Sequence, residues 1–147
     1  MYSYGFGNRR LEAQTENFGA DSGSQNNKMK IEGKIVQGYL KALTGLDQLP
    51  DGDGGRSIEL FRHGTLTIKL YAPRGTDPQH PHSRDEIYVI AAGSGRFVRS
   101  NREVSVSPGD VLFVAAGETH RFFDFSDDFA TWVFFYGPQG GEPETIG

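Results

Sequence analysis

Short runs of strand-forming residues, separated by closely spaced turn signals, occupy most of the chain from residue 57 to residue 136. The runs are rich in Val, Ile, Phe and Tyr, and the intervening segments PRGTDP, GSG, SNR, SPGD, AAGE and FSDD are rich in residues that favour turns. His63-Gly64 predicts a tight hairpin turn between strands at 57–62 and 65–71, because glycine accepts a positive φ. The sequence therefore predicts an all-β sandwich or barrel of antiparallel strands.

Four potential metal ligands lie within this region. His80 and His82 are two positions apart, so on an extended strand both imidazoles project from one face, and Glu86 keeps that parity. His120 supplies a third imidazole from elsewhere in the sheet. Three imidazoles and one carboxylate suit a divalent transition metal such as iron, manganese, nickel, copper or zinc, without selecting one. If coordination is octahedral, positions stay open for substrate, water or dioxygen.

The spacing of these residues resembles the first sequence motif of the cupin superfamily. That motif runs glycine, about five residues, H-x-H, three or four residues, glutamate, six residues and glycine. The chain fills these places with Gly75, His80, His82, Glu86 and Gly93, and only the first gap is shorter, at four residues.

The second cupin motif corresponds to Gly109, Ala115, Gly117, His120 and Asp124, of which the two glycines and the histidine match the family pattern. Ala115 replaces the proline of the family pattern and Asp124 replaces the asparagine. Neither position is a metal ligand in the family, so these departures concern turn rigidity and polarity around the site. The resemblance covers residues 57–136 and implies a double-stranded β-helix, or jelly-roll, barrel that holds one metal through all four ligands.

Length, charge and composition restrict the classes of partner that this chain is expected to bind. A length of 147 residues fits a single domain, and a net charge of −4 gives no basic surface for a polyphosphate backbone, so no nucleic acid is expected. The absence of cysteine excludes disulfides, thiolate ligands and a cysteine nucleophile. No apolar run is long enough to cross a bilayer, and the first residues lack the apolar core of a signal peptide. No membrane partner and a cytoplasmic location are therefore expected.

The chain divides into four stretches. Residues 1–30 are polar and rich in glycine, and they are expected to form a flexible N-terminal arm. Residues 31–56 are expected to form a short helix near Ile35–Leu43, which Gly45 would end, followed by a loop. The β-barrel is expected at 57–137, and 138–147 is expected to be a disordered C-terminal tail.

Two residues are predicted to take part in catalysis. Parity along the Glu86 strand places Tyr88 on the ligand face, where its hydroxyl could donate to a metal-bound substrate, or the ring could simply fill the core. Glu86 could act as a ligand and, if it detaches, as a base. Asp124 could orient a histidine or serve as a turn residue. The position of Gln79 does not clearly reach the cavity.

Cupins include dioxygenases, decarboxylases, isomerases and epimerases, and non-catalytic binders, and the fold does not choose among them. The first hypothesis is a metal-dependent dioxygenase-type oxidoreductase acting on a small oxygen-bearing organic substrate. The alternatives are a non-catalytic protein that binds a carbohydrate or another metabolite, and a cupin isomerase or decarboxylase. The resemblance to small cupins and the aromatic residues of the N-terminal arm also predict a homodimer, in which part of the first 45 residues packs across the partner's barrel.

Overall fold

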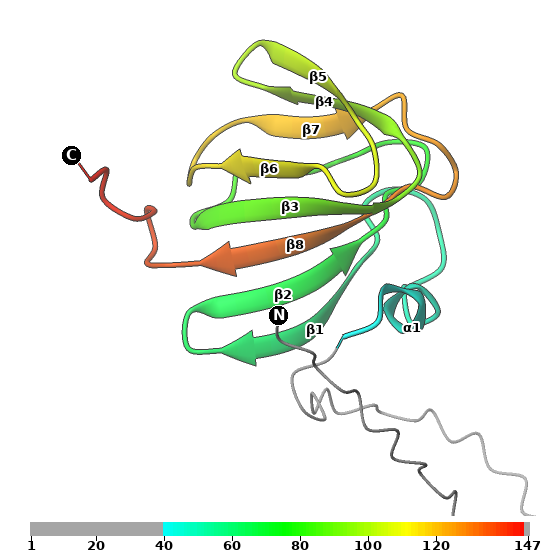
Figure 1. Ribbon diagram of the computed structural model, residues 1–147, viewed down its shortest axis with the longest axis horizontal. Helices are drawn as coiled ribbons and strands as arrows, with labels where there is room; N and C mark the ends of the chain where they lie inside the picture. The colour runs from blue at the N-terminus through cyan, green and yellow to red at the C-terminus, as the bar shows by residue number, and fades with distance from the viewer. Residues whose placement is uncertain (1–39, 146–147) are drawn as a thin grey trace, which may run out of the picture. The chain divides into compact units, whose positions relative to one another are not determined.

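The computed structural model describes residues 40–145. A short helix, α1 (Ala42–Leu46), precedes eight strands (Figure 1): β1 (Ser57–His63), β2 (Leu66–Tyr71), β3 (Asp85–Ala92), β4 (Gly95–Arg99), β5 (Arg102–Val106), β6 (Val111–Val114), β7 (His120–Phe123) and β8 (Ala130–Tyr136). The predicted N-terminal arm and most of the predicted helix at 35–43 lie outside the described residues. Within residues 40–145, no helix is long and apolar enough to span a membrane.

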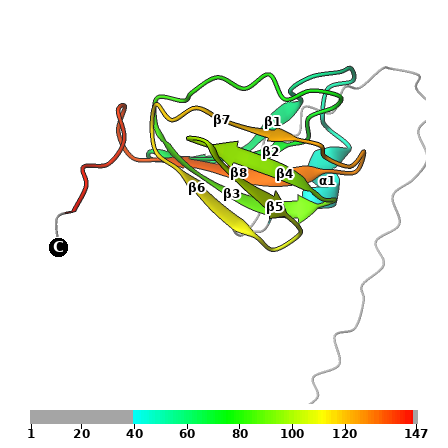
Figure 2. The ribbon, with the colours of Figure 1, turned by 90° about the horizontal axis from the view of Figure 1, so that it is seen from above.

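The strands form two antiparallel sheets. The larger sheet has the order β1-β2-β8-β3-β6, and the smaller has the order β5-β4-β7. The last strand, β8, pairs with both β2 and β3, so the chain returns to the middle of the larger sheet (Figures 1 and 2). This arrangement confirms the prediction of an all-β jelly-roll fold.

The core lies between the two sheets. Along β3 the side chains of Glu86, Tyr88 and Ile90 are buried, and those between them are only partly buried, as expected for a strand with one face toward a core. The Tyr88 ring packs edge-on against Phe122 of β7 with centroids 5.1 Å apart, and Phe122 packs against Phe97 of β4 at 4.9 Å. These aromatic contacts join the two sheets and fix the inward side of β3.

Gly45 lies inside α1, whereas the sequence predicts that this glycine ends the helix. A Cβ at this position would come within 2.9 Å of Leu60 Cδ1 and of Leu70 Cδ2. The glycine therefore allows α1 to approach β1 and β2 closely, and this packing requirement outweighs the ordinary tendency of glycine to stop helices.

The segment 72–84, which was expected to contain an extended strand with His80 and His82, forms no strand. Its only ladder contacts are isolated bridges at Arg74. Three prolines, at 73, 78 and 81, remove backbone N–H donors from the segment, which explains why it does not join the small sheet. The segment therefore crosses the open side of the barrel as an irregular chain, and alternation of side chains does not apply to it.

The first part of the C-terminal tail is held by hydrogen bonds. The Gly140 N–H donates to the Ser83 carbonyl at 2.6 Å, and the Glu142 N–H donates to Asp85 Oδ2 at 2.8 Å. The other oxygen of the buried Asp85 accepts from the Ala116 N–H at 2.9 Å. Asp85 thus connects the tail and the turn before β7 to the start of β3. The tail up to Glu142 is therefore held in place, whereas the sequence predicts a disordered tail.

Candidate metal centre

Three of the four predicted ligands converge. One ligand atom from each of His82, Glu86 and His120 can be chosen so that all lie within 4.8 Å of one another. His82 comes from the irregular segment, Glu86 from β3 and His120 from β7. Glu86 Oε1 lies 3.0 Å from His82 Nδ1 and 2.7 Å from His120 Nε2. The barrel therefore brings two imidazoles and one carboxylate to a single point.

The donor set fits a divalent metal ion. The side chain of Glu86 is fully buried, and its second oxygen, Oε2, has no hydrogen-bond partner among the described residues. A buried carboxylate oxygen without a partner is costly, and a coordinated cation would remove that cost. Two nitrogen ligands and one oxygen ligand suit iron, manganese, nickel or zinc.

His120 is oriented by its second ring nitrogen. Nδ1 lies 2.8 Å from the Glu118 carbonyl oxygen, so it must carry a hydrogen and donate. This contact leaves Nε2 as the nitrogen available to a metal. Asp124 does not perform this role: its side chain is exposed, its φ is 48°, and its carboxylate lies 3.7 Å from Arg96 Nη1. Of the two interpretations of Asp124, the structure supports the turn residue.

Burial and hydrogen bonding act in opposite directions on the pKa values of the two buried ligands. Burial opposes a negative charge on Glu86, but hydrogen bonds from His120 and His82 outweigh it, and the pKa of Glu86 is lowered. Burial also opposes a positive charge on His120, but its hydrogen bonds to Glu86 and to the Glu118 carbonyl outweigh it, and the pKa of His120 is raised. Both shifts favour the charged forms, a carboxylate on Glu86 and an imidazolium on His120, and a metal would compete with the proton for Nε2.

Tyr88 fills the core with its ring and reaches the ligands with its hydroxyl. The side chain is fully buried, and the hydroxyl donates to Gln79 Oε1 at 2.8 Å and lies 2.9 Å from His120 Nε2. Burial, and then the charge of Glu86, raise the pKa of Tyr88, which keeps the phenol protonated. The ring therefore fills the core, as one of the two interpretations had it, and the hydroxyl lies beside His120. The catalytic roles of Tyr88 and Glu86 stay predictions.

His80 is not brought to the other three ligands. Its side chain is exposed, and it lines a neighbouring pocket that Gln79 and His82 also border, but it is not part of the cluster of three ligands. The expectation that His80 and His82 share a face assumed an extended strand, which the segment does not form. Only His82 turns inward, and a ligand role for His80 stays a prediction.

Asp77 and Gln79 were missed as parts of the site. Asp77 Oδ1 accepts from the Tyr71 hydroxyl at 2.5 Å, and Oδ2 accepts from Gln79 Nε2 and from the Phe122 N–H, each at 2.7 Å. Gln79 in turn accepts from Tyr88, which places it in the hydrogen-bond network of the ligands. Asp before Pro signals a turn, but no sequence pattern indicates that these side chains face inward.

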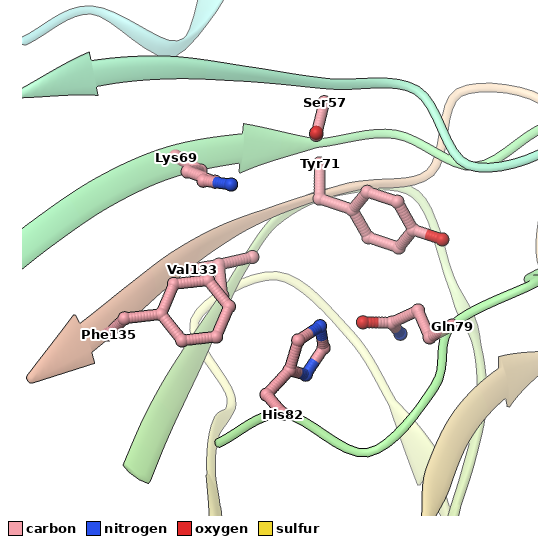
Figure 3. Close-up of a pocket in the computed structure, with 7 residues that line it drawn as sticks. All are labelled: Ser57, Lys69, Tyr71, Gln79, His82, Val133 and Phe135. Atoms are coloured by element: carbon pink, nitrogen blue, oxygen red, sulfur yellow. The ribbon is translucent and has the colours of Figure 1, made fainter. Parts of the chain in front are cut away.

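A pocket opens beside His82. It has a volume of about 100 Å³ and lies between β1, β2, β8 and the irregular segment (Figure 3). Its lining residues are Ser57, Lys69, Tyr71, Gln79, His82, Val133 and Phe135. Of the three converging ligands, only His82 borders this pocket, and Glu86 and His120 are buried and do not line it. A small molecule would therefore approach the centre past His82.

Comparison with known proteins agrees with this fold. A family model described as a cupin domain matches residues 67–136, from the second residue of β2 to the end of β8. An uncharacterized protein from Streptomyces coelicolor is 31% identical over 87 residues, which are 58% of this chain and 83% of that protein. The transcriptional activator RhaS of Yersinia pestis (strain Pestoides F) is 32% identical over 85 residues, 56% of this chain but only 31% of RhaS.

A solved structure shows the same fold. The DMSP lyase DddQ from Ruegeria pomeroyi superposes with a TM-score of 0.50 and 24% sequence identity, over 56% of this chain and 47% of that one. The matched family, the two-sheet barrel and the converging His and Glu ligands lead to the same assignment. The chain belongs to the cupin superfamily.

Proposed function

We propose that this protein is a metal-dependent oxidoreductase of the dioxygenase type that acts on a small oxygen-bearing organic substrate. The observation that carries the proposal is the convergence of His82, Glu86 and His120 on one point. Two histidines and one carboxylate that leave positions open are the ligand set of non-haem iron oxygenases. When bound, a redox-active metal would supply the site with activation of dioxygen and polarisation of the substrate.

The residues around the ligands have definable tasks in such a site. The Glu118 carbonyl holds His120 in one tautomer, and the Tyr88 hydroxyl lies within hydrogen-bond distance of the same imidazole. The Tyr88 hydroxyl donates to Gln79 Oε1 in this structure. If the Gln79 side chain moved away, the phenol could donate to a substrate oxygen instead. The aromatic core behind Glu86 and His120 keeps bulk water away from the buried side of the centre.

A non-catalytic binding protein is the second candidate. It is favoured by the similarity to RhaS, a transcriptional activator, because the match covers only 31% of that protein and so corresponds to one part of it. An isomerase or decarboxylase would use the same ligands. Oxygen consumption separates the first hypothesis from all of these alternatives.

The test begins with metal content. Protein purified without added metal is expected to hold about one divalent ion per chain, as measured by elemental analysis. His82→Ala and His120→Ala should each lose most of this metal while keeping the β-sheet circular dichroism spectrum, and His80→Ala tests the fourth predicted ligand. His63→Ala is the matched control, because His63 is exposed at the end of β1 and contacts only Phe61 by stacking among the described rings.

Activity is measured next with an oxygen electrode, after reconstitution with iron, manganese or nickel. A panel of a catechol, a flavonol, a keto acid and a thiol is expected to contain at least one compound that drives oxygen uptake, and His120→Ala should abolish that uptake. Full metal occupancy in both the His82 and His120 variants would contradict the metal centre. Tight ligand binding without oxygen uptake or any other product would favour the binding protein.

A further inference from the structure

Lys69 is the only lysine or arginine among the residues that line the pocket beside His82. It lies on β2, and its side chain is half-buried. Figure 3 shows its terminal nitrogen directed toward the side of the pocket that Ser57 and Tyr71 form, with His82 across the same space. The pocket therefore has a positive charge at one end and a predicted metal ligand at the other.

The carboxylate opposite Lys69, that of Glu59, already forms an ion pair with Arg62. Glu59 of β1 is the cross-strand partner of Lys69, but its two oxygens accept from Arg62 Nε at 2.9 Å and from Arg62 Nη2 at 2.7 Å. The hydrogen bond from Arg62, and more weakly the charge of Lys69, lower the pKa of Glu59. Within residues 40–145, no carboxylate lies within 4 Å of the Lys69 nitrogen.

The walls beside Lys69 are apolar. Val133 and Phe135 of β8 line the pocket, and Lys69 Nζ lies 5.6 Å from the centre of the Phe135 ring. Arg84 also lies near this ring, at 5.8 Å, but its nitrogens donate to the Thr65 carbonyl and to Thr67 Oγ1. An anion beside Lys69 would be partly shielded from water, which strengthens its attraction to the ammonium group.

We propose that Lys69 binds the carboxylate of the substrate, so that the substrate is a small organic acid. In this arrangement the carboxylate contacts Lys69, an apolar body lies against Val133 and Phe135, and a second oxygen of the molecule faces His82. A single ammonium group with apolar neighbours suits a monoanionic carboxylate better than a phosphate, which requires several donors. The inference rests on the proposed function for the chemistry at the metal, but not for the anion site itself.

The test compares L-lactate with L-lactamide, two molecules of similar shape that differ in charge. Their dissociation constants are measured by ligand-observed NMR on the full-length protein, both metal-free and nickel-loaded. Wild-type protein should bind lactate about tenfold more tightly than lactamide, because the ion pair with Lys69 is available only to the acid. Inorganic phosphate should bind more weakly than lactate.

Three variants isolate the side chain. Lys69→Met should weaken lactate binding about tenfold and leave lactamide unchanged, and Lys69→Arg should keep most of the preference for the acid. Arg102→Gln, at the start of β5 on the other sheet, removes the same charge elsewhere and should have no effect. Metal content should be unchanged in all three, which separates the anion site from the metal centre.

The outcomes are distinguishable. Equal affinity for lactate and lactamide in wild-type protein, an unchanged preference in Lys69→Met, or an equal loss in Arg102→Gln would overturn the inference. Phosphate bound as tightly as lactate would overturn its assignment to carboxylates. A wild-type protein that takes up no metal on purification or reconstitution, and still prefers lactate through Lys69, would support the anion site and contradict the proposed metal-dependent oxidoreductase.

Discussion

His120 links metal binding to pH through a single ring nitrogen. Nδ1 donates to the Glu118 carbonyl, so only Nε2 can exchange a proton for a metal. Because the net effect of its hydrogen bonds raises the pKa of His120, the proton stays on Nε2 to a higher pH than in a free histidine, whose pKa is about 6.5. A proton and the metal therefore compete for the same nitrogen, His120 Nε2.

Metal affinity should fall as the pH is lowered, and the fall should begin above about pH 6.5. The sign follows from the raised pKa: below it the metal must displace a bound proton, and above it the nitrogen is free. Titration against a competing chelator between about pH 5 and pH 8 measures the effect. His63→Ala should follow the wild-type curve, and a pH-independent affinity would argue against ligation by histidine.

At the next scale, the irregular segment 72–84 takes the place of a strand. The segment forms no continuous ladder of backbone hydrogen bonds with a neighbouring strand. It is anchored instead by the Asp77 carboxylate, which accepts hydrogen bonds from Tyr71, Gln79 and the Phe122 N–H. These contacts hold the segment between β2 and β7, five residues before His82. The position of His82 therefore depends on a side chain that is not itself a ligand.

Asp77→Ala should weaken metal binding and lower the free energy of unfolding by about 1–3 kcal/mol, because it leaves several donors without an acceptor. Asp110→Ala is the matched control, since Asp110 also accepts from a backbone N–H, that of Ser107 at 2.8 Å, in the turn between β5 and β6, which carries none of the ligands. The control should lose some stability in urea unfolding but keep the affinity of the wild-type protein for metal. Equal metal affinity in both variants would show that Asp77 supports the fold alone.

Sequence reasoning succeeded where strands are regular. On β3, strict alternation placed Glu86 and Tyr88 together on the buried face, and the structure agrees. It failed for the expectation that His80 and His82 share one face of a strand, and it did not place Gln79, because the segment that carries them contains three prolines and forms no strand. It also failed for Gly45, whose place inside α1 depends on contact with Leu60 and Leu70, which are far away in sequence.

At the scale of the whole molecule, the barrel leaves apolar side chains exposed on two edge strands. Val104 of β5 and Val111 and Phe113 of β6 are 48%, 64% and 46% exposed, and each strand ends its sheet. Edge strands with exposed apolar residues are usually covered by another chain or segment. This surface supports the prediction, made from the sequence, that the protein is a homodimer.

The predicted dimer should depend on the N-terminal residues. If part of the first 45 residues packs across the partner's barrel, deletion of Met1–Lys30 should shift the mass measured by multi-angle light scattering toward the monomer and lower the thermal midpoint. Val111→Asp, which places a charge on the exposed apolar surface, tests whether β6 takes part without touching the arm. An unchanged mass and midpoint after the deletion would remove the arm from the interface. A full-length protein that is monomeric at micromolar concentration would contradict the dimer itself, and the exposed strands would then need no partner of this kind.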